Sequence, residues 1–259
     1  MVIGKNQNPW QECHVPRVLR SGMVVARRIS GGGAVYHDEG NLNYAFFMPR
    51  TLYDAEAIYA VIARVLEPWG LNVERMNRTS LAVNGFKFSG NAFCLRRQAA
   101  MHHGTLLVDA DLDRLRWALR PPEWRIESRA TPSVPAPVKN LVDWCPDLDW
   151  AKLVEAFHRC CGDDQPISEI GAHDGAADDT ARRAGREPDW VYGRSPPFTI
   201  RFGESESSSP GDTWQATVEK DRVMAIDAPA NARPWLRVGE RFSDAMQKKQ
   251  WDLPASQPR

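Results

Sequence analysis

The densest group of residues that could bind a charged ligand lies near residue 30. Three successive glycines at 31–33 follow Ser30, and Arg27 and Arg28 stand just before them. Glycines lack side chains, so a ligand can approach the main chain and accept hydrogen bonds from its N–H groups. Arginine adds planar, permanently charged donors that suit phosphate or carboxylate. The pattern indicates an anion-binding loop, but it is neither a Walker A sequence nor a dinucleotide fingerprint. A glycine-rich turn beside solvated arginines is the alternative.

A second candidate is Lys87, which stands in a Lys-Phe-Ser-Gly segment. Asn-Gly at 84–85 separates two short β patterns and predicts a hairpin with a type I′ turn, because both central residues need positive φ. Strict alternation places Lys87 and Ser89 on the face opposite Phe86 and Phe88. A lysine on a rigid strand supplies a fixed positive charge, and an exposed strand lysine without a role is the alternative.

Two adjacent histidines, His102 and His103, are a third candidate. They fall in a strand pattern over 101–108, where neighbouring side chains point to opposite faces. The pair therefore cannot chelate one metal ion, and at most one of the two faces a site. A histidine buried in the core next to an exposed one is the alternative interpretation.

The cysteines do not form a recognisable site. No spacing is Cys-x-x-Cys, and their number, 5, is odd. We expect neither a disulfide framework nor a zinc site, and a reducing compartment is favoured. The cysteines are Cys13, Cys94, Cys145, Cys160 and Cys161.

Composition excludes several classes of protein. The chain has 259 residues with 33 basic and 33 acidic side chains, so its formal charge is zero. A dedicated nucleic-acid binder usually has a basic excess, so nucleic acid is not an expected partner. No apolar run reaches the roughly 20 residues that cross a bilayer, and no membrane partner is expected. The first residues, 1–6, have neither the basic start nor the apolar stretch of a signal peptide.

The elements expected around the candidates are strands and helices. Strand patterns cover 23–29 and 42–48, and the second alternates apolar with smaller or polar residues. A helix is predicted over 51–67, with Thr51 as its N-cap and Asp54 three residues later.

The rest of the chain contains shorter elements. The segment 130–138 cannot form a central strand or a helix, because its prolines remove main-chain donors. Helices are predicted over 112–119 and 149–160. Residues 171–188, rich in Gly, Ala, Asp and Arg, are interpreted as a linker. Further short strands are predicted at 190–202, 213–218 and 222–226, with a last helix near 239–249.

The three candidate clusters occur in a specific order. Arg-Arg-Ile-Ser-Gly-Gly-Gly-Ala-Val-Tyr-His-Asp at 27–38 precedes Lys-Phe-Ser-Gly at 87–90 and His-His-Gly-Thr-Leu-Leu at 102–107. This order closely resembles the lipoate–protein ligase family. The resemblance runs from residue 2 to about Leu141, and more loosely to the C-terminus. Other similar segments are 2–13, 40–43 and, in the lipoyltransferase branch of the family, 133–141.

The resemblance implies a fold. We expect an α/β (α+β) catalytic domain over 1–192, built on the mixed sheet of the biotin/lipoate ligases, and a small α+β accessory domain over 195–259. The family usually begins some tens of residues earlier. We therefore expect either a shortened N-terminal part of the sheet or a start codon upstream of Met1.

The resemblance also implies a reaction. The family activates lipoate with ATP and Mg²⁺ to lipoyl-AMP. It then transfers the acyl group to a lysine of lipoyl domains in 2-oxoacid dehydrogenase E2 subunits, or of the glycine-cleavage H protein. Lys87 would be the catalytic residue, in contact with acyl oxygen and phosphate, and 130–138 would be a mobile adenylate-binding loop. No protein metal ligand is predicted.

The implied binding residues fall into three sets. ATP and lipoyl-AMP would be bound by Arg28, Ser30, Gly31, Gly32, Gly33, Ala34, Val35, Tyr36 and Lys87. Lipoate would be bound by Arg28, Ser30, His37, Lys87 and His103. Val35, Leu42, Phe46 and Leu106 are apolar candidates for lining the slot of its tail.

Two other functions stay open. Ser80 stands where the family usually has an aspartate, and loss of that carboxylate would affect activation by ATP more than acyl transfer. A transferase that moves a preformed lipoyl or octanoyl group is therefore one alternative. Cys94 is the thiol nearest to Lys87 in sequence, although a buried apolar cysteine is the favoured interpretation. A binding module that has lost catalysis is the other alternative.

The expected surroundings follow from the same resemblance. We expect a monomer in the cytoplasm, with the mitochondrial matrix as the alternative compartment. The pair Arg96-Arg97 is a candidate for docking an acidic acceptor, and a solvated turn is the alternative.

Overall fold

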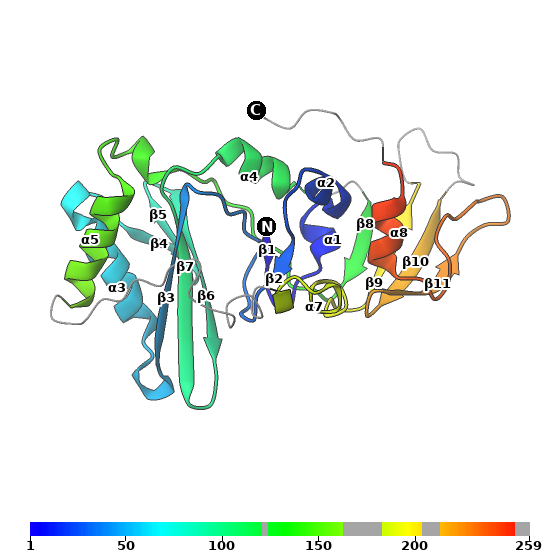
Figure 1. Ribbon diagram of the computed structural model, residues 1–259, viewed down its shortest axis with the longest axis horizontal. Coiled ribbons are helices and arrows are strands. Elements are labelled where there is room, and N and C mark those ends of the chain that lie inside the picture. The colour runs from blue at the N-terminus through cyan, green and yellow to red at the C-terminus, as the bar shows by residue number, and fades with distance from the viewer. Residues whose placement is uncertain (121–123, 163–182, 204–212, 252–259) are drawn as a thin grey trace. The chain divides into compact units, whose positions relative to one another are not determined.

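The computed structural model describes residues 1–120, 124–162, 183–203 and 213–251 (Figure 1). The chain divides into two compact units, each with its own hydrophobic core. The predicted boundary between 1–192 and 195–259 stays a prediction, because compactness alone does not delimit functional domains. Unit 1 consists of Met1–Tyr36, Asp113–Ser133 and Ala176–Arg259, and unit 2 of His37–Leu112 and Val134–Gly175.

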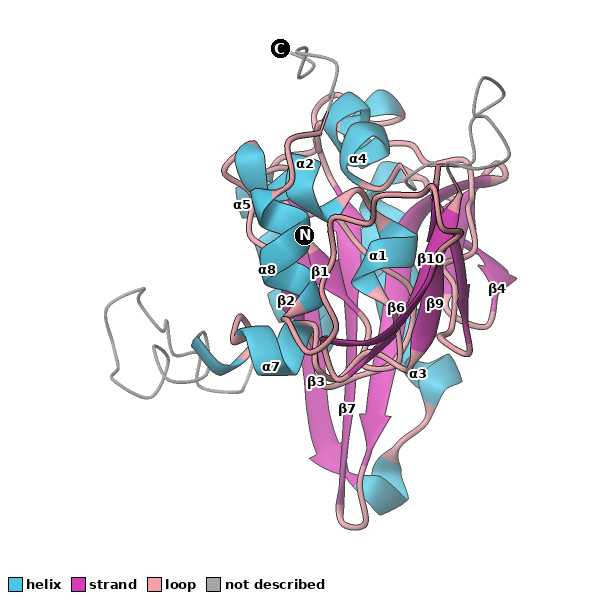
Figure 2. Cartoon of the chain, turned by 90° about the vertical axis from the view of Figure 1, so that its right-hand side faces the viewer, coloured by secondary structure: helices cyan, strands magenta, loops and turns pink. Residues whose placement is uncertain are grey.

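Unit 2 is built on antiparallel strands in the order β3-β7-β6-β5-β4. Figure 2 shows β3, β7 and β6 side by side. Leu42 and Tyr44 of β3 are buried, while Asn43 and Ala45 are exposed, which confirms the predicted alternation. The buried face packs with α3 and α5 in one core. The strands are β3 Asn41–Pro49, β4 Glu74–Asn77, β5 Ser80–Val83, β6 Phe86–Leu95 and β7 Ala99–Leu107. The helices are η1 Arg50–Leu52, α3 Ala55–Leu66, η2 Glu67–Trp69, η3 Leu141–Asp143 and α5 Trp150–Cys161.

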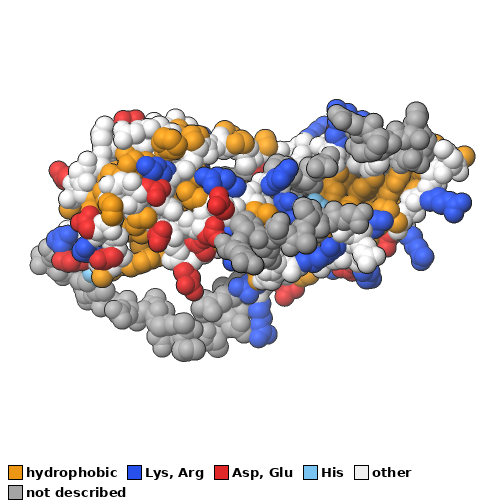
Figure 3. All heavy atoms as spheres, turned by 90° about the horizontal axis from the view of Figure 1, so that it is seen from above, with side chains coloured by type: hydrophobic (Ala, Val, Ile, Leu, Met, Phe, Trp, Pro, Cys, Tyr) orange, Lys and Arg blue, Asp and Glu red, His pale blue; other side chains and the backbone are white. Residues whose placement is uncertain are grey.

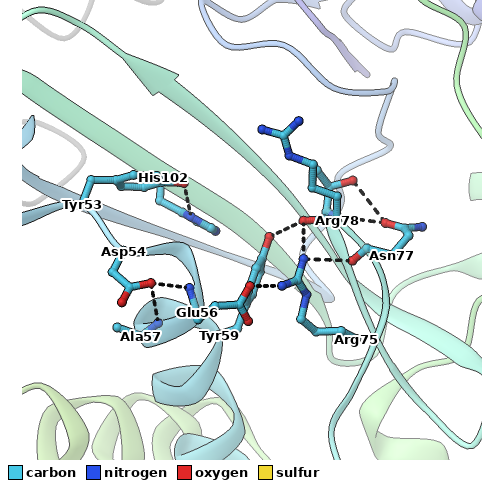
Figure 4. Close-up of polar contacts among 10 residues, drawn as sticks. Tyr53, Asp54, Glu56, Ala57, Tyr59, Arg75, Asn77, Arg78 and His102 are labelled. Carbon is cyan, nitrogen blue, oxygen red and sulfur yellow. Dashed lines mark hydrogen bonds and ion pairs between the residues drawn. The ribbon is translucent and has the colours of Figure 1, made fainter.

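Helix α3 begins later than the sequence predicts. Its N-cap is Asp54, whose carboxylate accepts hydrogen bonds from the main-chain N–H groups of Glu56, at 2.8 Å, and Ala57, at 3.3 Å (Figure 4). Thr51, the predicted N-cap, lies in the separate turn η1, and Leu52 is exposed. The prediction for Thr51 is wrong because one carboxylate satisfies two unpaired donors at the helix start.

The β5–β6 hairpin confirms the predicted turn. Asn84 and Gly85 have φ of 50° and 78°, as a type I′ turn requires. Strict alternation beyond the turn is wrong, because Ala82 pairs with Lys87 and Leu81 with Ser89. The bulge between these pairs adds one residue to β6 and re-aims its side chains.

Unit 1 contains a parallel pair, β1 with β2, and a four-stranded antiparallel sheet in the order β11-β10-β9-β8. Trp10 anchors its core against Phe242, with ring centroids 5.0 Å apart, and against Tyr192 at 5.5 Å. The strands are β1 Val2–Ile3, β2 Ala26–Arg27, β8 Arg125–Ser128, β9 Phe198–Phe202, β10 Trp214–Glu219 and β11 Arg222–Asp227. The helices are α1 Pro9–Glu12, α2 Val15–Arg20, α7 Pro188–Val191 and α8 Phe242–Lys248, and α4 Leu112–Ala118 begins at the last residue before the unit boundary.

Two strand predictions in unit 1 are too long. The strand predicted over 23–29 is reduced to β2, because its partner β1 has only 2 residues. The strand predicted from Trp190 begins at Phe198. Trp190 lies in α7, where Pro188 is suited to the first helical position. The linker predicted over 171–188 lies largely outside the described residues.

The surface has mixed charge. Figure 3 shows acidic and basic side chains interspersed on the face that it draws, as the equal numbers of the two charges predict. Among the described helices, none combines the length and apolar composition needed to cross a membrane.

Candidate functional site

The glycine loop of unit 1 is held by the N-terminal segment. The main-chain N–H of Lys5 donates to the Ser30 carbonyl at 2.8 Å, and that of Arg28 donates to the Ile3 carbonyl at 3.0 Å. A Cβ atom on Gly4 would lie 2.1 Å from the Gly32 carbonyl oxygen. Only glycine therefore fits at position 4, and the loop and the first strand form one packed structure.

Arg28 shapes the loop. Its guanidinium donates to the Gly31 carbonyl at 2.6 Å and 3.1 Å, to the Gly33 carbonyl at 2.7 Å and to the Val2 carbonyl at 3.3 Å. Burial lowers the pKa of Arg28 to about 10, which leaves it charged at neutral pH. Its donors are occupied by the loop, so Arg28 acts here by fixing the loop's conformation.

Ser133 closes the loop from a distant part of the sequence. The sequence included it in the expected adenylate-binding loop 130–138 but gave it no individual role. Its Oγ accepts hydrogen bonds from the Ala34 N–H at 2.8 Å and from Gln7 Nε2 at 3.1 Å. Its own N–H donates to Glu12 Oε1 at 3.2 Å, and burial raises the pKa of Glu12. A Cβ atom on Gly33 would lie 2.9 Å from Ser133 Oγ. The sequence feature that could have pointed to Ser133 was the similarity of 133–141 to the lipoyltransferase branch of the family.

Arg27 is structural. It is only 2% exposed, and no carboxylate among the described residues pairs with it. Burial lowers its pKa to about 10. Its guanidinium is satisfied by Ser195 Oγ at 2.9 Å and by the carbonyl oxygens of Gly4, Lys5, Gln7, Trp190 and Val191.

The other predicted residues of this loop are part of the packed structure. Ser30 is 1% exposed and Tyr36 6%. Val35 exchanges two main-chain hydrogen bonds with Val2, at 2.8 Å and 2.9 Å. The loop is therefore ordered by contacts within itself and with the N-terminal strand and Ser133.

Lys87 presents an unpaired charge in unit 2. Its Nζ lies 3.4 Å from where a Cβ on Gly90 would be, so the missing side chain makes room for the ammonium group. Burial lowers the pKa of Lys87. Within the described residues, the ammonium has no hydrogen bond and no ion pair. A half-buried cation without a counter-ion is costly and therefore suited to an anionic ligand.

The proline-rich segment pairs with the main chain of Lys87. The Lys87 N–H donates to the Pro137 carbonyl at 2.9 Å, and the Lys139 N–H donates to the Lys87 carbonyl at 3.1 Å. Asn140 anchors the end of this segment, because its side chain bonds the N–H and the carbonyl of Ala110 at 3.1 Å and 2.8 Å. The part of the predicted loop nearest to Lys87 is therefore fixed by main-chain hydrogen bonds.

The face of the sheet that carries Lys87 also carries His103. Thr105 Oγ1 lies 3.8 Å from the same Cβ position on Gly90 and accepts the Gly90 N–H at 3.3 Å. His103 is two residues from Thr105 and so shares its face. His37, also in unit 2, contacts Asn41 Nδ2 through Nδ1 at 2.8 Å.

His102 points the other way, into the core. It is fully buried, and burial lowers its pKa to about 4. Its Nε2 lies 3.0 Å from Asn91 Oδ1, and its Nδ1 lies 3.2 Å from the Tyr53 hydroxyl (Figure 4). Tyr44 also donates to Asn91 Oδ1. His102 is therefore the core histidine of the pair, and a binding role of His103 stays a prediction.

The apolar slot predicted from residue type is partly wrong. Leu42 and Leu106 are 7% and 0% exposed and belong to the core that packs with α3 and α5. Phe46 packs against the same core. These three side chains therefore lie on the face opposite Lys87, because residue type alone does not distinguish a core face from a binding face.

The side chains do not fit a protein-bound Mg²⁺ ion. Ser80 is buried and pairs with Gly90, so a hydroxyl stands where a carboxylate was expected near Lys87. Mg²⁺ prefers carboxylate oxygens together with phosphates. Among the described residues, no group of three or more His, Cys, Asp or Glu side chains could hold a metal ion. The predicted Mg²⁺, which would arrive with ATP and without a dedicated set of protein ligands, stays a prediction.

The fold is that of solved lipoate ligases. The fold matches LipL1 of P. falciparum, solved in complex with lipoate, with a TM-score of 0.63 and 24% identity over 87% of this chain and 68% of that one. It also matches a lipoate-protein ligase A bound with ATP, with a TM-score of 0.56 and 24% identity over 72% of this chain and 77% of that one. At such identities the likeness concerns the fold alone.

The chain belongs to the lipoyl protein ligase A/B catalytic domain family, which matches residues 1–161. It is 40% identical to the mitochondrial lipoyl amidotransferase LIPT1 of Mus musculus, over 95% of this chain and 69% of that protein. It is 34% identical to lipoate-protein ligase A of Psychrobacter cryohalolentis, over 77% of this chain and 62% of that protein. The chain thus spans about two thirds of the length of these relatives. The resemblance stated from the sequence is confirmed.

Proposed function

We propose that this chain is an enzyme that attaches a lipoyl group to a lysine of an acceptor protein. The observation that carries the proposal is the ammonium group of Lys87, which is half-buried beside Gly90 and lacks a partner among the described residues. Family membership supports lipoate as the acyl group. The printed functions of the relatives, a lipoyl amidotransferase and a lipoate ligase, support protein lipoylation.

The proposed role of Lys87 is electrostatic. The acceptor amine attacks the acyl carbonyl carbon, and negative charge develops on the carbonyl oxygen. A fixed ammonium group next to that oxygen stabilises the charge, and one such donor typically contributes about 3 kcal/mol. The tetrahedral intermediate then collapses to the new amide and expels AMP from lipoyl-AMP, or the lysine amine from a lipoylated donor protein. The proton lost by the attacking amine goes to solvent in the first case and to the departing amine in the second.

The proposed role of the unit 1 loop is to bind the anionic part of the acyl donor. Arg28 and Ser133 hold the loop in one conformation, which reduces the entropy lost on binding. Ser30 and the main chain of 31–36 remain the proposed contacts of lipoyl-AMP or ATP. Lipoate binding by Arg28, Ser30, Lys87, His37 and His103 is likewise a proposal.

Two acyl donors are compatible with this proposal. A preformed lipoyl donor is favoured by Ser80, because the residue opposite Gly90 offers a hydroxyl in place of a carboxylate that could help to position Mg²⁺ for activation. Activation of free lipoate by ATP is the second candidate, favoured by the similarity to a lipoate-protein ligase. The acceptor would be a lipoyl domain of an E2 subunit or the H protein. The compartment would be the cytoplasm or the mitochondrial matrix, and the enzyme a monomer.

The test uses the full chain with a lipoyl domain as acceptor. Transfer from lipoyl-AMP, or from a lipoylated protein, is measured by the mass of the acceptor. Lys87→Ala should lower the rate about 100-fold or more, since it removes the proposed oxyanion donor. Lys5→Ala, an exposed lysine in the other unit, is the matched control. Equal rates for wild type and Lys87→Ala would refute the proposed role.

The same assay separates the two donors. Pyrophosphate release that requires both ATP and lipoate would assign the ligase reaction. Label that moves only from a preformed donor would assign the transferase. Binding of lipoyl-AMP with no acyl transfer from any donor would assign the binding module and end the enzymatic proposal.

A further inference from the structure

One end of the unit 2 sheet exposes apolar and basic side chains together. Phe47 is 76% exposed, Leu52 70% and Leu95 39%, although large apolar side chains are normally covered. Arginines that are also exposed stand next to them in the sequence. We call this the sheet-end surface and define it as Phe47, Arg50, Leu52, Leu95, Arg96 and Arg97.

The two segments of the sheet-end surface are adjacent in space. Met48 of β3 pairs with Ala100 of β7, and Ala100 pairs in turn with Leu95 of β6. The Arg50 N–H donates to the Gln98 carbonyl at 2.9 Å. Figures 1 and 2 both show the η1 turn and the β6–β7 hairpin at the same end of this sheet. The two segments therefore meet at the same end of the sheet, with Phe47 on the face that carries His103 and Leu95 on the other face.

The charges of this surface are available for a partner. Within the described residues, the guanidinium groups of Arg50, Arg96 and Arg97 have no hydrogen bond and no ion pair. Arg50 lies over the Tyr53 ring, 5.9 Å from its centroid. Arg75, by contrast, is paired with a glutamate of α3 (Figure 4). No acidic residue occurs in 47–52 or 95–98, so the surface is complementary to carboxylates.

We propose that the sheet-end surface docks the acceptor protein through a carboxylate-bearing patch of the acceptor. The proposal rests on the proposed function, which requires such an acceptor. A protein partner is favoured because all the cations are arginines, which are enriched at protein interfaces while lysine is depleted. An exposed phenylalanine is a suitable anchor. The zero net charge of the chain argues against a polyanion such as RNA.

The dimensions allow one acceptor domain to reach both places. Lys87 and Leu95 are eight residues apart on β6, which corresponds to about 26 Å at roughly 3.3 Å per residue. A folded domain of about 100 residues has a radius of gyration of about 13 Å and a diameter of about 34 Å. Such a domain can present its lysine at Lys87 while it contacts Phe47, which lies on the same face of the sheet at its far end.

The test measures binding before any chemistry. Unlipoylated lipoyl domain is titrated calorimetrically into the full chain. Arg96→Glu combined with Arg97→Glu should weaken binding at least 10-fold, because carboxylates would face carboxylates. The effect should shrink at 0.5 M salt, since the Debye length then falls to about 4 Å. The matched control is Arg64→Glu combined with Arg159→Glu, exposed arginines of the same unit, which should change the Kd less than 2-fold.

Several results would overturn the docking proposal. Absence of binding by the wild type, or equal weakening by the control pair, overturns the docking proposal. The proposal is also overturned if Arg96→Glu/Arg97→Glu keeps its affinity for the lipoyl domain. It would then be RNA or anionic phosphatidylserine vesicles whose binding the variant loses. Phe47→Ser supplies an uncharged second variant and should weaken binding at least 3-fold.

Turnover separates the two proposals. Acyl transfer to a short lysine peptide should be the same in wild type and Arg96→Glu/Arg97→Glu, while the KM for the lipoyl domain rises about 10-fold. If the chain binds the lipoyl domain as expected but transfers no acyl group, the proposed function fails and the docking surface stands. If the variants lipoylate the domain with unchanged KM, the function stands and the docking surface fails.

Discussion

His102 should make unit 2 acid-sensitive in a predictable range of pH. Asn91 Oδ1 must accept from His102 Nε2, because it also accepts from a tyrosine, so the neutral imidazole carries its proton on Nε2. Burial lowers the pKa from 6.5 to about 4, so protons bind the unfolded chain first as the pH falls. Stability from this group is complete above about pH 6.5 and is lost progressively down to about pH 4. The two pKa values give a loss of about 2 kcal/mol at pH 5 and about 3 kcal/mol at pH 4.

The assay is urea denaturation of wild type and His102→Gln at pH 7.5 and pH 5. The variant is less stable at pH 7.5, because it loses a buried ring and its hydrogen bonds. Its stability should fall by about 2 kcal/mol less between the two pH values than that of wild type. His158→Gln, at an exposed histidine on α5, is the matched control. A wild-type pH dependence that survives in His102→Gln would refute the assignment of a neutral, buried histidine.

Three other changes have defined outcomes. As the pH is raised, the rate of acyl transfer should begin to fall before the ordinary lysine pKa of 10.5 is reached, because burial lowers the pKa of Lys87. A rate that falls only at or above pH 10.5 would contradict the assignment. Gly40→Ala should destabilise the chain by about 2 kcal/mol or more in urea denaturation, since its Cβ would lie 1.9 Å from a main-chain oxygen. Gly31→Ala should cost less than about 1 kcal/mol, because a Cβ at position 31 would lie in open space. Arg27→Met should lower the free energy of unfolding by more than about 3 kcal/mol, because several buried carbonyl oxygens lose their donor. Arg20→Met, at an exposed arginine, should lower it by less than about 1 kcal/mol. Similar losses in both variants would contradict the buried role of Arg27.

Local signals in the sequence predicted much of unit 2. Alternation identified β3, and Asn-Gly identified the turn at 84–85, because both depend on neighbouring residues alone. The bulge in β6 carries no such signal, since it is set by the pairing of β5 with β6. The start of α3 was missed because two residues of the right type compete for the cap, and only the three-dimensional path of the chain selects Asp54.

The site was predicted as residue types rather than as contacts. Lys87 and His103 lie on one face of the sheet, in line with the resemblance, but Leu42 and Leu106 were placed in a slot although they belong to the core. Ser133 was missed because its partners lie about a hundred positions away, at a separation where periodicity carries no information. The distinction between Arg28 and Arg27 also depends on tertiary contacts, which consecutive arginines do not reveal.

The strand-like bridge at Lys87 explains where prolines are tolerated. The bridge uses the carbonyl of Pro137 as acceptor and the N–H of Lys139 as donor. Pro137 therefore does not need the main-chain N–H that proline lacks. Opening this stretch would leave two main-chain groups of a half-buried residue unpaired, at about 1 kcal/mol each. A hinge for any movement of the proline-rich segment therefore belongs on the N-terminal side of Pro137. A proline at position 139 would remove the N–H that bonds the Lys87 carbonyl.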